Sequence, residues 1–358
     1  MPLRLKDIAR LTGVSTSTVS RVINGDPRIS PETSRRVKEC LVHTGYTLNT
    51  IARSLKTKRT YTVGFLAPEL VNDFFMNIAE AAESALRKKG YSMFICNSKE
   101  DLDEERRQFA LLAEKCVDGI LWIPVSSEGR FAREVRDLGI PIIAVDRMPE
   151  DESIDAVLVD NTGGSRAAVK HILDSGYSRV GFIGGNMNLT SARERYEGYR
   201  LALAERGIPP EEEIIRFGDF HVQSGYDLMA ELMESHRPPE YVFIANYYMH
   251  LGAVKYLAET GGRGGRKGSA RIAHFDDMEI TSLLGFSSLT IRQPMEEIGR
   301  KAAALLIERI ETPESAMTPG GKSRLRGEEA SQENAHKIIR LATRLIDNRF
   351  EEIQKSNN

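Results

Sequence analysis

The spacing of apolar residues near the start of the chain predicts two short helices joined by a tight turn. Apolar residues recur at intervals of three and four over residues 5–12 and 16–23. Between these segments, Gly13 suits the left-handed conformation that ends a helix, and Ser15 suits the N-cap of the next helix. The side chains expected to face inward are Ile8, Ala9, Leu11, Val19, Val22 and Ile23.

A third helix is expected to follow and to complete a small three-helix head. Ser30 and Pro31 form a typical helix start, with an N-cap residue, a proline at the first helical position and an acid, Glu32, in the first turn. The helical pattern ends at Gly45. The apolar residues expected to face the first two helices are Val37, Leu41 and Val42.

From residue 61 onward, short and continuously apolar runs alternate with amphipathic segments of helical period. Such strands are buried on both faces, so the alternation predicts a parallel sheet covered by helices on each side. The alternation restarts at residue 156, which indicates two similar α/β lobes with a ligand cleft between them. Strands are expected at residues 63–67, 92–96, 119–123, 141–145, 156–159, 179–183, 241–244 and 271–275, and helices at 78–89, 104–115, 129–138, 163–175, 192–206, 224–235 and 249–259.

The outer side of the second helix carries short hydroxyl side chains and one arginine, which suit the floor of a DNA major groove. These side chains are Thr16, Ser17, Ser20 and Arg21. Other basic residues of the head suit DNA phosphates, which position a domain without reading sequence. The residues expected to contact phosphates in this way are Arg28, Arg35, Arg36 and Lys38.

The charge of the chain is distributed asymmetrically. The sequence of 358 residues has a formal net charge of -2. Residues 1–60 nevertheless hold twelve Lys and Arg against four Asp and Glu, so the remainder is acidic. A basic head on an acidic body is typical of a protein that binds nucleic acid through the head.

Other features argue against membrane, secreted and enzymatic classes. No run of about eighteen apolar residues is present, and the polar N-terminus lacks the apolar core of a secretory signal. Cys40, Cys96 and Cys116 are few and odd in number, which favours a reducing cytoplasm over a disulfide framework. No dinucleotide-binding, nucleophile-elbow or metalloprotease motif is present, and residues 321–323 lack the context of a phosphate-binding loop. We therefore expect no enzyme activity, no cofactor and no metal.

Residues 49–56 predict one further short helix. Asn49 can cap it, and Ala52 and Leu55 are apolar positions beside Arg53. A helix this short is marginal alone in water, so DNA and a second copy of the chain are expected to order it. An exposed leucine among cations suits a wedge that enters the DNA minor groove. The alternative is a linker helix that packs on the body.

The head resembles the signature of the LacI/GalR family of repressors. The resemblance begins at Leu5 and includes the run Gly13-Val-Ser-Thr-Ser-Thr-Val-Ser-Arg-Val-Ile-Asn24. The short segment Ala52-Arg-Ser-Leu55 is similar to the hinge helix of that family. Motifs of the body that are similar to the family are Val117–Ile120, Val159–Asn161, Gly181–Gly185, Ser191–Arg195, Phe275–Asp277 and Leu289–Pro294.

The resemblance implies a homodimeric, cytoplasmic transcriptional repressor that binds a near-palindromic operator in double-stranded DNA. Its fold would be an all-α helix-turn-helix head followed by a two-lobed α/β core with parallel sheets, like that of periplasmic binding proteins. Each head would lay its second helix in a major groove, and paired hinge helices would open the central minor groove. The residues implied to contact DNA are Thr16, Ser17 and Arg21 for bases, Ser15, Thr18, Asn24 and Asn49 for phosphates or the turn, and Ala52, Arg53 and Leu55 in the hinge.

The resemblance also implies how the chain is divided. The head would comprise residues 1–46, the hinge helix and linker 47–60, the first lobe 61–160 plus 293–320, and the second lobe 161–291 plus 321–358. Crossovers between the lobes are expected near residues 160, 291 and 320. Residues 261–268 and 312–337 have no counterpart in the family and are expected to be insertions, whereas 338–350 predict either a closing strand and turn or an association helix.

A small-molecule effector is expected in the cleft between the lobes. Arg195 can grip a diol, a phosphate or a carboxylate with two parallel hydrogen bonds, and its alternative is a surface ion pair with Glu194 or Glu197. Asp146 and Asp276 each follow an apolar strand, where acids need donors such as sugar hydroxyls, and an Arg195–Asp276 pair is expected without ligand. The residues implied to bind the effector are Asp73, Phe74, Phe75, Asp146, Asp160, Arg195, Phe220, Asn246 and Asp276.

The sequence departs from the family at the rim of this cleft. Tyr247 and Tyr248 stand where the family has aspartate and a small apolar residue, which predicts an unusual effector or a smaller cleft. Leu48 stands where the family usually has a proline before the hinge. For Phe220, the alternative to contact with the effector is a role as a core residue. A sugar or sugar derivative is the favoured effector, with a purine-like ligand as the alternative. A stand-alone periplasmic-type sugar carrier is a further alternative, against which the basic head argues.

Overall fold

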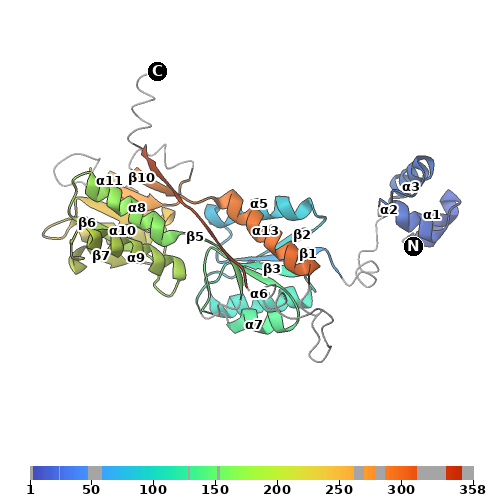
Figure 1. Cartoon of the computed structure of the whole chain (residues 1–358), viewed down its shortest axis with the longest axis horizontal. Helices are drawn as coiled ribbons and strands as arrows, with labels where there is room; N and C mark the ends of the chain where they lie inside the picture. Colours follow the sequence, from blue (N-terminus) through green and yellow to red (C-terminus); the bar gives the residue numbers. More distant parts are fainter. Residues whose placement is uncertain are drawn as a thin grey trace, which may run out of the picture. The chain divides into compact units, whose positions relative to one another are not determined.

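The structure is a computed structural model of the chain that divides into two compact units, Met1–Thr60 and Tyr61–Asn358. We call these units the head and the body and describe each by itself. Figure 1 shows their helices and strands. The residues that the structure describes are 3–23, 25–46, 59–127, 130–150, 154–261, 270–278, 287–312 and 336–348.

The described part of the head contains the helices α1 (Leu5–Thr12), α2 (Thr16–Ile23) and α3 (Pro31–Thr44). Gly13 ends α1 with a φ of 66°, and the Ser15 hydroxyl accepts a hydrogen bond from the backbone N–H of Thr18 at 3.1 Å. The Ser30 hydroxyl caps α3 in the same manner, and Gly45 ends that helix in the left-handed conformation. The three predicted helices and their caps are confirmed. The buried core residues are Ile8, Ala9, Val19, Val22 and Val37.

Two residues that were expected in this core are exposed instead. Leu11 retains 59% and Val42 84% of its accessible surface. In a unit of three helices, each helix is covered along one stripe only, so an apolar side chain beyond that stripe faces solvent. The prediction that these two side chains point inward is wrong.

The first lobe of the body is built on a sheet of six parallel strands. These are β1 (Thr62–Ala67), β2 (Ser92–Asn97), β3 (Gly119–Trp122), β4 (Ile142–Val145), β5 (Asp155–Val159) and β11 (Ile338–Leu341). Its helices are α5 (Asp73–Arg87), α6 (Leu102–Glu114), α7 (Arg130–Asp137) and α13 (Met295–Glu311). The strand order is β11-β5-β4-β3-β1-β2. Apolar residues of α5 and α13 pack on one face of this sheet and those of α6 and α7 on the other.

The second lobe repeats this design with one antiparallel strand at the edge. Its strands are β6 (Val180–Gly184), β7 (Ile215–Phe217), β8 (Tyr241–Ile244), β9 (Arg271–Phe275), β10 (Ser287–Arg292) and β12 (Arg344–Asp347). Its helices are α8 (Asn161–Asp174), α9 (Thr190–Glu205), α10 (Val222–Met233), α11 (Tyr247–Glu259) and the 3-10 turn η1 (Glu212–Ile214). The strand order is β12-β10-β9-β8-β6-β7, and β12 runs antiparallel to β10.

The two-lobed α/β fold with parallel sheets is confirmed. Apolar runs became strands because both faces of each sheet are covered, which leaves their side chains fully buried in β3, β4 and β8. Neither β7 nor α13 is predicted from the apolar pattern alone. Within the described residues, no helix is both long and apolar enough to cross a membrane.

Three crossovers join the lobes within the described residues, at residue 160, at 293–294 and at 342–343. The last of these differs from the crossover expected near residue 320. Strand β11 pairs with β5 of the first sheet, Ile338 opposite Ala156, before the chain enters the second sheet as β12. The assignment of residues 321–358 to the second lobe is therefore wrong for β11. Figure 1 shows these dark red strands leading from one lobe to the other.

Candidate functional site

The exposed side of α2 presents the side chains that were expected to read DNA. Thr16, Ser17 and Arg21 are exposed there. The Ser15 hydroxyl lies 2.8 Å from the hydroxyl of Ser17 and 2.9 Å from that of Thr18. The helix start therefore offers a row of hydroxyl groups, with a guanidinium one turn further along.

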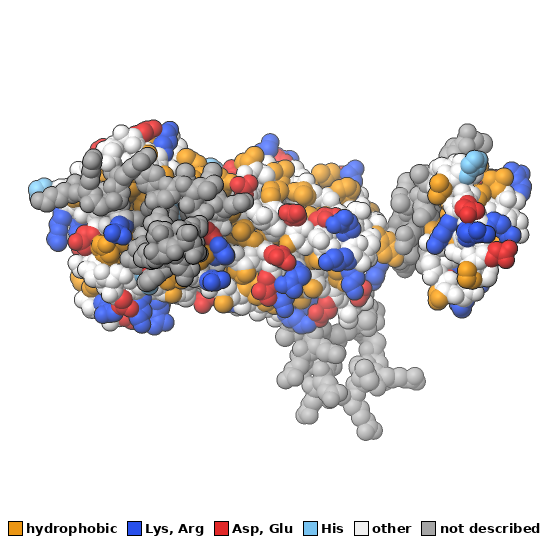
Figure 2. All heavy atoms as spheres, turned by 90° about the horizontal axis from the view of Figure 1, so that it is seen from above, with side chains coloured by type: hydrophobic (Ala, Val, Ile, Leu, Met, Phe, Trp, Pro, Cys, Tyr) orange, Lys and Arg blue, Asp and Glu red, His pale blue; other side chains and the backbone are white. Residues whose placement is uncertain are grey.

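The basic residues around this helix are in two different states. Arg28 is bound by Asp26, with its Nη2 2.7 Å and its Nε 2.9 Å from the carboxylate oxygens. These hydrogen bonds hold the pKa of Asp26 near 2, well below its usual value. Arg35, Arg36 and Lys38 are exposed on α3 and present their charges to solvent. Figure 2 shows Lys and Arg side chains on the visible face of the head.

Several residues of the expected DNA interface lie outside the described residues. They are Asn24 and the hinge residues Asn49, Ala52, Arg53 and Leu55. Their roles stay predictions.

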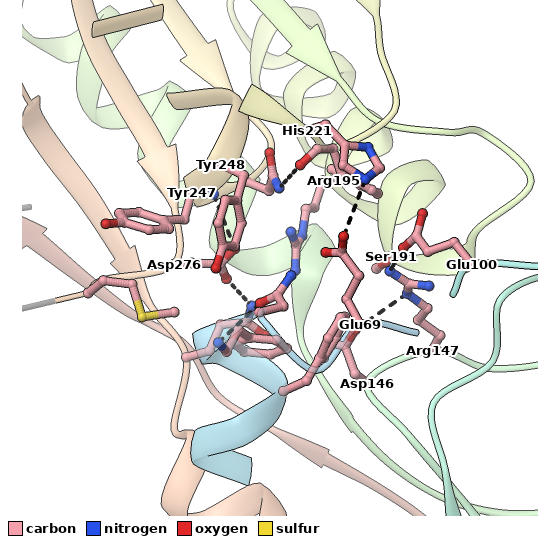
Figure 3. A pocket seen from close by; sticks show the side chains of 17 residues that line it. Glu69, Glu100, Asp146, Arg147, Ser191, Arg195, His221, Tyr247, Tyr248 and Asp276 are labelled. Atoms are coloured by element: carbon pink, nitrogen blue, oxygen red, sulfur yellow. Dashed lines mark hydrogen bonds and ion pairs between the residues drawn. The ribbon is translucent and has the colours of Figure 1, made fainter. Parts of the chain in front are cut away.

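A cavity of about 520 Å³, counted with the space at its open mouth, lies between the two lobes of the body. Asp146 directly follows β4 and Asp276 directly follows β9, so the cavity lies at the carboxyl ends of the strands. Figure 3 shows how the side chains converge on it. It is lined by Glu69, Asn72, Phe74, Phe75, Glu100, Asp146, Arg147, Ser191, Arg195, Phe220, His221, Asn246, Tyr247, Tyr248, Asp276, Met278 and Gln293.

Of the residues implied to bind the effector, all but Asp73 and Asp160 line this cavity. The Asp160 carboxylate accepts a hydrogen bond from the backbone N–H of Gly163 at 2.8 Å and thereby caps α8. Asp73 lies in the first turn of α5 and contacts Tyr248 through its backbone N–H. The two tyrosines expected at the rim are both among the lining residues.

Arg195 is held rigidly in the wall of the cavity. Its Nε donates to the side-chain oxygen of Asn161 at 2.8 Å, and its Nη1 donates to the carbonyl oxygen of Ala245 at 2.6 Å. The guanidinium carbon lies 4.1 Å from the centre of the Phe275 ring. The residue is only 4% exposed. These contacts leave Nη2 without a hydrogen-bond partner among the described residues, so this nitrogen is available to a ligand.

The expected Arg195–Asp276 pair is wrong. Among the described residues no ion pair joins the two side chains. Instead, the side-chain amide of Gln293 donates to one carboxylate oxygen of Asp276, and the backbone N–H of Tyr247 donates to the other at 3.3 Å. Neutral groups thus hydrogen-bond to both the guanidinium of Arg195 and the carboxylate of Asp276, so the two side chains are accommodated without an ion pair between them. The alternative surface pairs are also absent among these residues, since Glu194 binds Arg340 at 2.9 Å and Glu197 binds Arg200 at 3.2 Å.

Asp146 is a buried acid with an unsatisfied oxygen. It is 5% exposed, and burial raises its pKa to about 6, although the nearby charges of Arg195 and Arg147 act in the opposite direction. One carboxylate oxygen lies 3.8 Å from Nε of Arg147. The remaining nitrogens of Arg147 donate to the carbonyl of Pro124 at 3.0 Å and to Glu100 at 3.4 Å.

Three buried polar atoms of the lining residues have no hydrogen-bond partner within the described part of the chain. They are Oδ1 of Asp146, Nε of Arg147 and Oε1 of Gln293. Buried polar atoms are almost always hydrogen-bonded in folded proteins, so a group of unpaired ones around a cavity indicates where a ligand or water binds.

Two of these three residues, Arg147 and Gln293, were not predicted to bind an effector. Arg147 directly follows the predicted Asp146, and Gln293 lies inside the family motif Leu289–Pro294, so both are adjacent to a signal in the sequence. Neither residue belongs to a periodic apolar pattern, because Arg147 lies in the loop after β4 and Gln293 in the loop after β10.

Comparison with known proteins matches both units of the chain. Residues 4–49 match bacterial regulatory proteins of the lacI family, and residues 60–331 match the periplasmic binding proteins and sugar binding domain of the LacI family. The ribose operon repressor of Escherichia coli (strain K12) is 33% identical over 313 residues, which cover 86% of this chain and 93% of that protein. The HTH-type transcriptional repressor PurR of Aliivibrio salmonicida is 31% identical over 307 residues, which cover 86% of this chain and 92% of that protein.

Among solved structures, the complex of the transcriptional regulator CelR with cellobiose is similar, with a TM-score of 0.68 and 27% identity. The alignment covers 96% of this chain and 98% of CelR. The curated relatives are repressors and not enzymes, which agrees with the expectation that the chain is not an enzyme. This chain belongs to the LacI family of bacterial regulatory proteins and is a DNA-binding transcriptional repressor regulated by a small molecule.

Proposed function

We propose that the protein is a homodimer that binds operator DNA through α2 and changes its affinity when a sugar or sugar derivative occupies the cavity between the lobes. The observation that carries the choice of ligand is the set of unpaired buried atoms around the cavity. Asp146 and Gln293 each offer an oxygen that needs a donor, and Arg147 offers a nitrogen that needs an acceptor.

A hydroxyl group satisfies such a mixed set because it both donates and accepts hydrogen bonds. The other carboxylate oxygen of Asp146, Oδ2, lies 3.8 Å from Nε of Arg147, so the two side chains are close enough for hydroxyls of one sugar ring to bind both. Nη2 of Arg195 adds a further donor on the side of the second lobe. A phosphate or a carboxylate accepts only and leaves the oxygens of Asp146 and Gln293 without donors.

The charges of the lining residues also favour a neutral ligand over an anionic one. Four carboxylates face two guanidinium groups around the cavity, which disfavours an anionic ligand. The carboxylates are those of Glu69, Glu100, Asp146 and Asp276, and the guanidinium groups are those of Arg147 and Arg195.

Aromatic rings supply the apolar part of the site. The ring of Phe220 packs against Gly185 so closely that an added Cβ would lie 2.0 Å from it, so only glycine allows this position of the ring. Phe74 and Phe75 line the cavity from the first lobe. Such rings can contact the C–H groups of a sugar, and they can equally stack on a planar base. A purine-like ligand is therefore the second candidate.

The test is a thermal-shift screen of the full chain against sugars, sugar phosphates and nucleobases, because a ligand that binds the folded state raises the melting temperature. We expect a neutral sugar to raise it and the Asp146→Asn variant to lose that response. Electrophoretic mobility shifts of an operator fragment with and without the same sugar then test the control of DNA binding. A response to nucleobases alone would favour the second candidate, and a response to sugar phosphates alone would contradict the argument from charge.

A further inference from the structure

We infer that Tyr248 is a specificity-determining residue that limits the effector to a compact ring, an inference that rests on the ligand site proposed above. Tyr248 lies in the first turn of α11 in the second lobe. Its hydroxyl donates to the carbonyl oxygen of Val71 at 3.1 Å and accepts from the backbone N–H of Asp73 at 3.3 Å, and both partners belong to the first lobe. Figure 3 shows its ring among the residues that converge on the cavity.

The bridge lies close to solvent, because Val71 is 79% exposed. Tyr248 lines the cavity together with the buried residues Asp146 and Arg195. We therefore expect a ligand that binds these buried residues and extends toward solvent to meet the ring of Tyr248.

The bridge also completes the start of a helix. The first N–H groups of a helix have no partner within it. At the start of α5, the side chain of Asn72 accepts from the N–H of Phe74 at 3.1 Å, and the Tyr248 hydroxyl takes the N–H of Asp73. Displacement of Tyr248 would exchange this hydrogen bond and the one to Val71 for hydrogen bonds to water.

A second side chain of the second lobe, His221, contacts the same segment of the first lobe. His221, directly before α10, lies with its Nε2 3.5 Å from a carboxylate oxygen of Glu69. Glu69 and Val71 both belong to the segment 68–72 between β1 and α5. The ring of Tyr248 is further held against the buried ring of Tyr247, with centroids 5.3 Å apart at 75°. Two side chains of the second lobe thus contact this segment of the first lobe beside the cavity, and we expect a second sugar ring to displace at least one of them.

Binding of matched compact and extended compounds to the full chain tests this inference. The compact compounds are D-glucose, D-galactose and adenine, and their extended partners are cellobiose, lactose and adenosine. By titration calorimetry, we expect the wild-type protein to bind at least one compact compound and to bind its extended partner about tenfold or more weakly, the effect of two lost hydrogen bonds.

Two substitutions and a control locate the cause of that difference. Tyr248→Ala removes the ring and the bridge and should bring the affinities of a pair to within about threefold of each other. Tyr248→Phe keeps the ring but loses both hydrogen bonds, so it should narrow the gap in the same direction and serves where the alanine variant does not fold. Tyr226→Ala is the matched control, because Tyr226 lies on α10 outside the lining residues and bonds to Glu259.

Two results would contradict the limit on ligand size while leaving the proposed sugar site unaffected. One is equal affinity of the wild-type protein for the compact and the extended compound of a pair. The other is a difference between these affinities that neither Tyr248 variant changes. Binding of adenine alone overturns the choice of a sugar, and the size limit is then judged from adenosine. If no compound binds the wild-type protein or the Tyr248→Ala variant, both proposals fail.

Discussion

Replacing Asp146 with asparagine should stabilise the unliganded body. The carboxyl group is buried, and its pKa rises from 3.8 to about 6 because burial disfavours the charged form. An acid with a raised pKa lowers the free energy of unfolding at neutral pH, since the unfolded chain carries the charge at no such cost. The difference between the two pKa values corresponds to about 3 kcal/mol. This is an upper bound for Asp146→Asn, because the asparagine amide also needs hydrogen-bond partners.

The sign of the pH dependence follows from the same comparison. Above pH 6 the carboxylate of Asp146 is charged in both the folded and the unfolded protein, and its burial lowers the free energy of unfolding by the full amount. As the pH falls through 6 toward 3.8, the folded protein binds the proton before the unfolded chain does, so the cost disappears. Urea unfolding of the full chain should therefore show the Asp146→Asn variant to be more stable by up to about 3 kcal/mol at pH 7.5, and by about half of that at pH 5.

An exposed acid provides the control for this measurement. Asp137 lies at the end of α7 and is exposed, so Asp137→Asn should change stability by less than about 0.5 kcal/mol at both pH values. If Asp146→Asn raises the free energy of unfolding equally at both pH values, or does not raise it at all, then other groups of the folded protein stabilise the charged carboxylate. The argument that this oxygen awaits a ligand would then be refuted.

Other predictions concern the head and the second lobe. Arg21→Ala should weaken operator binding by about 1–3 kcal/mol and relax its specificity, whereas Arg35→Ala should weaken binding to specific and random duplexes alike; mobility shifts on both duplexes separate these outcomes. Arg195→Met should lower the free energy of unfolding by about 1–3 kcal/mol in urea, because it leaves the buried side-chain oxygen of Asn161 unpaired; unchanged stability would contradict the structural role of that bond. Burial lowers the pKa of His274 to about 4, so its contribution to stability is lost as the pH falls from 6.5 toward 4. The urea midpoint of the His274→Gln variant should therefore vary less between pH 7 and pH 5 than that of the wild-type protein. An equal pH dependence of the two midpoints would contradict the lowered pKa of His274.

Local chemistry made the head predictable. Gly13, Ser15 and Ser30 act through their own backbone neighbours, so their conformation follows from the residue type and its position. Leu11 and Val42 could not be placed in the same way, because their exposure depends on how much of each helix the other two helices cover.

The cavity was predictable in its location but only partly in its contacts. Asp146 and Asp276 follow apolar strands, and the ends of parallel strands meet at one edge of a sheet. The partners of Arg195 were not predictable, because Asn161 reaches it from a crossover whose position depends on the packing of both lobes. The bridge from Tyr248 to the first lobe likewise joins residues 177 positions apart and has no trace in the local pattern.

The position of β11 has a consequence for the order in which the protein is made. The first lobe draws on three separate pieces of the chain, and its edge strand is supplied by residues 338–341. Until these residues leave the ribosome, β5 presents an open edge of unpaired backbone groups, which other chains can bind. A nascent chain that stalls before this point would therefore be prone to aggregate, even though its head had been synthesised long before.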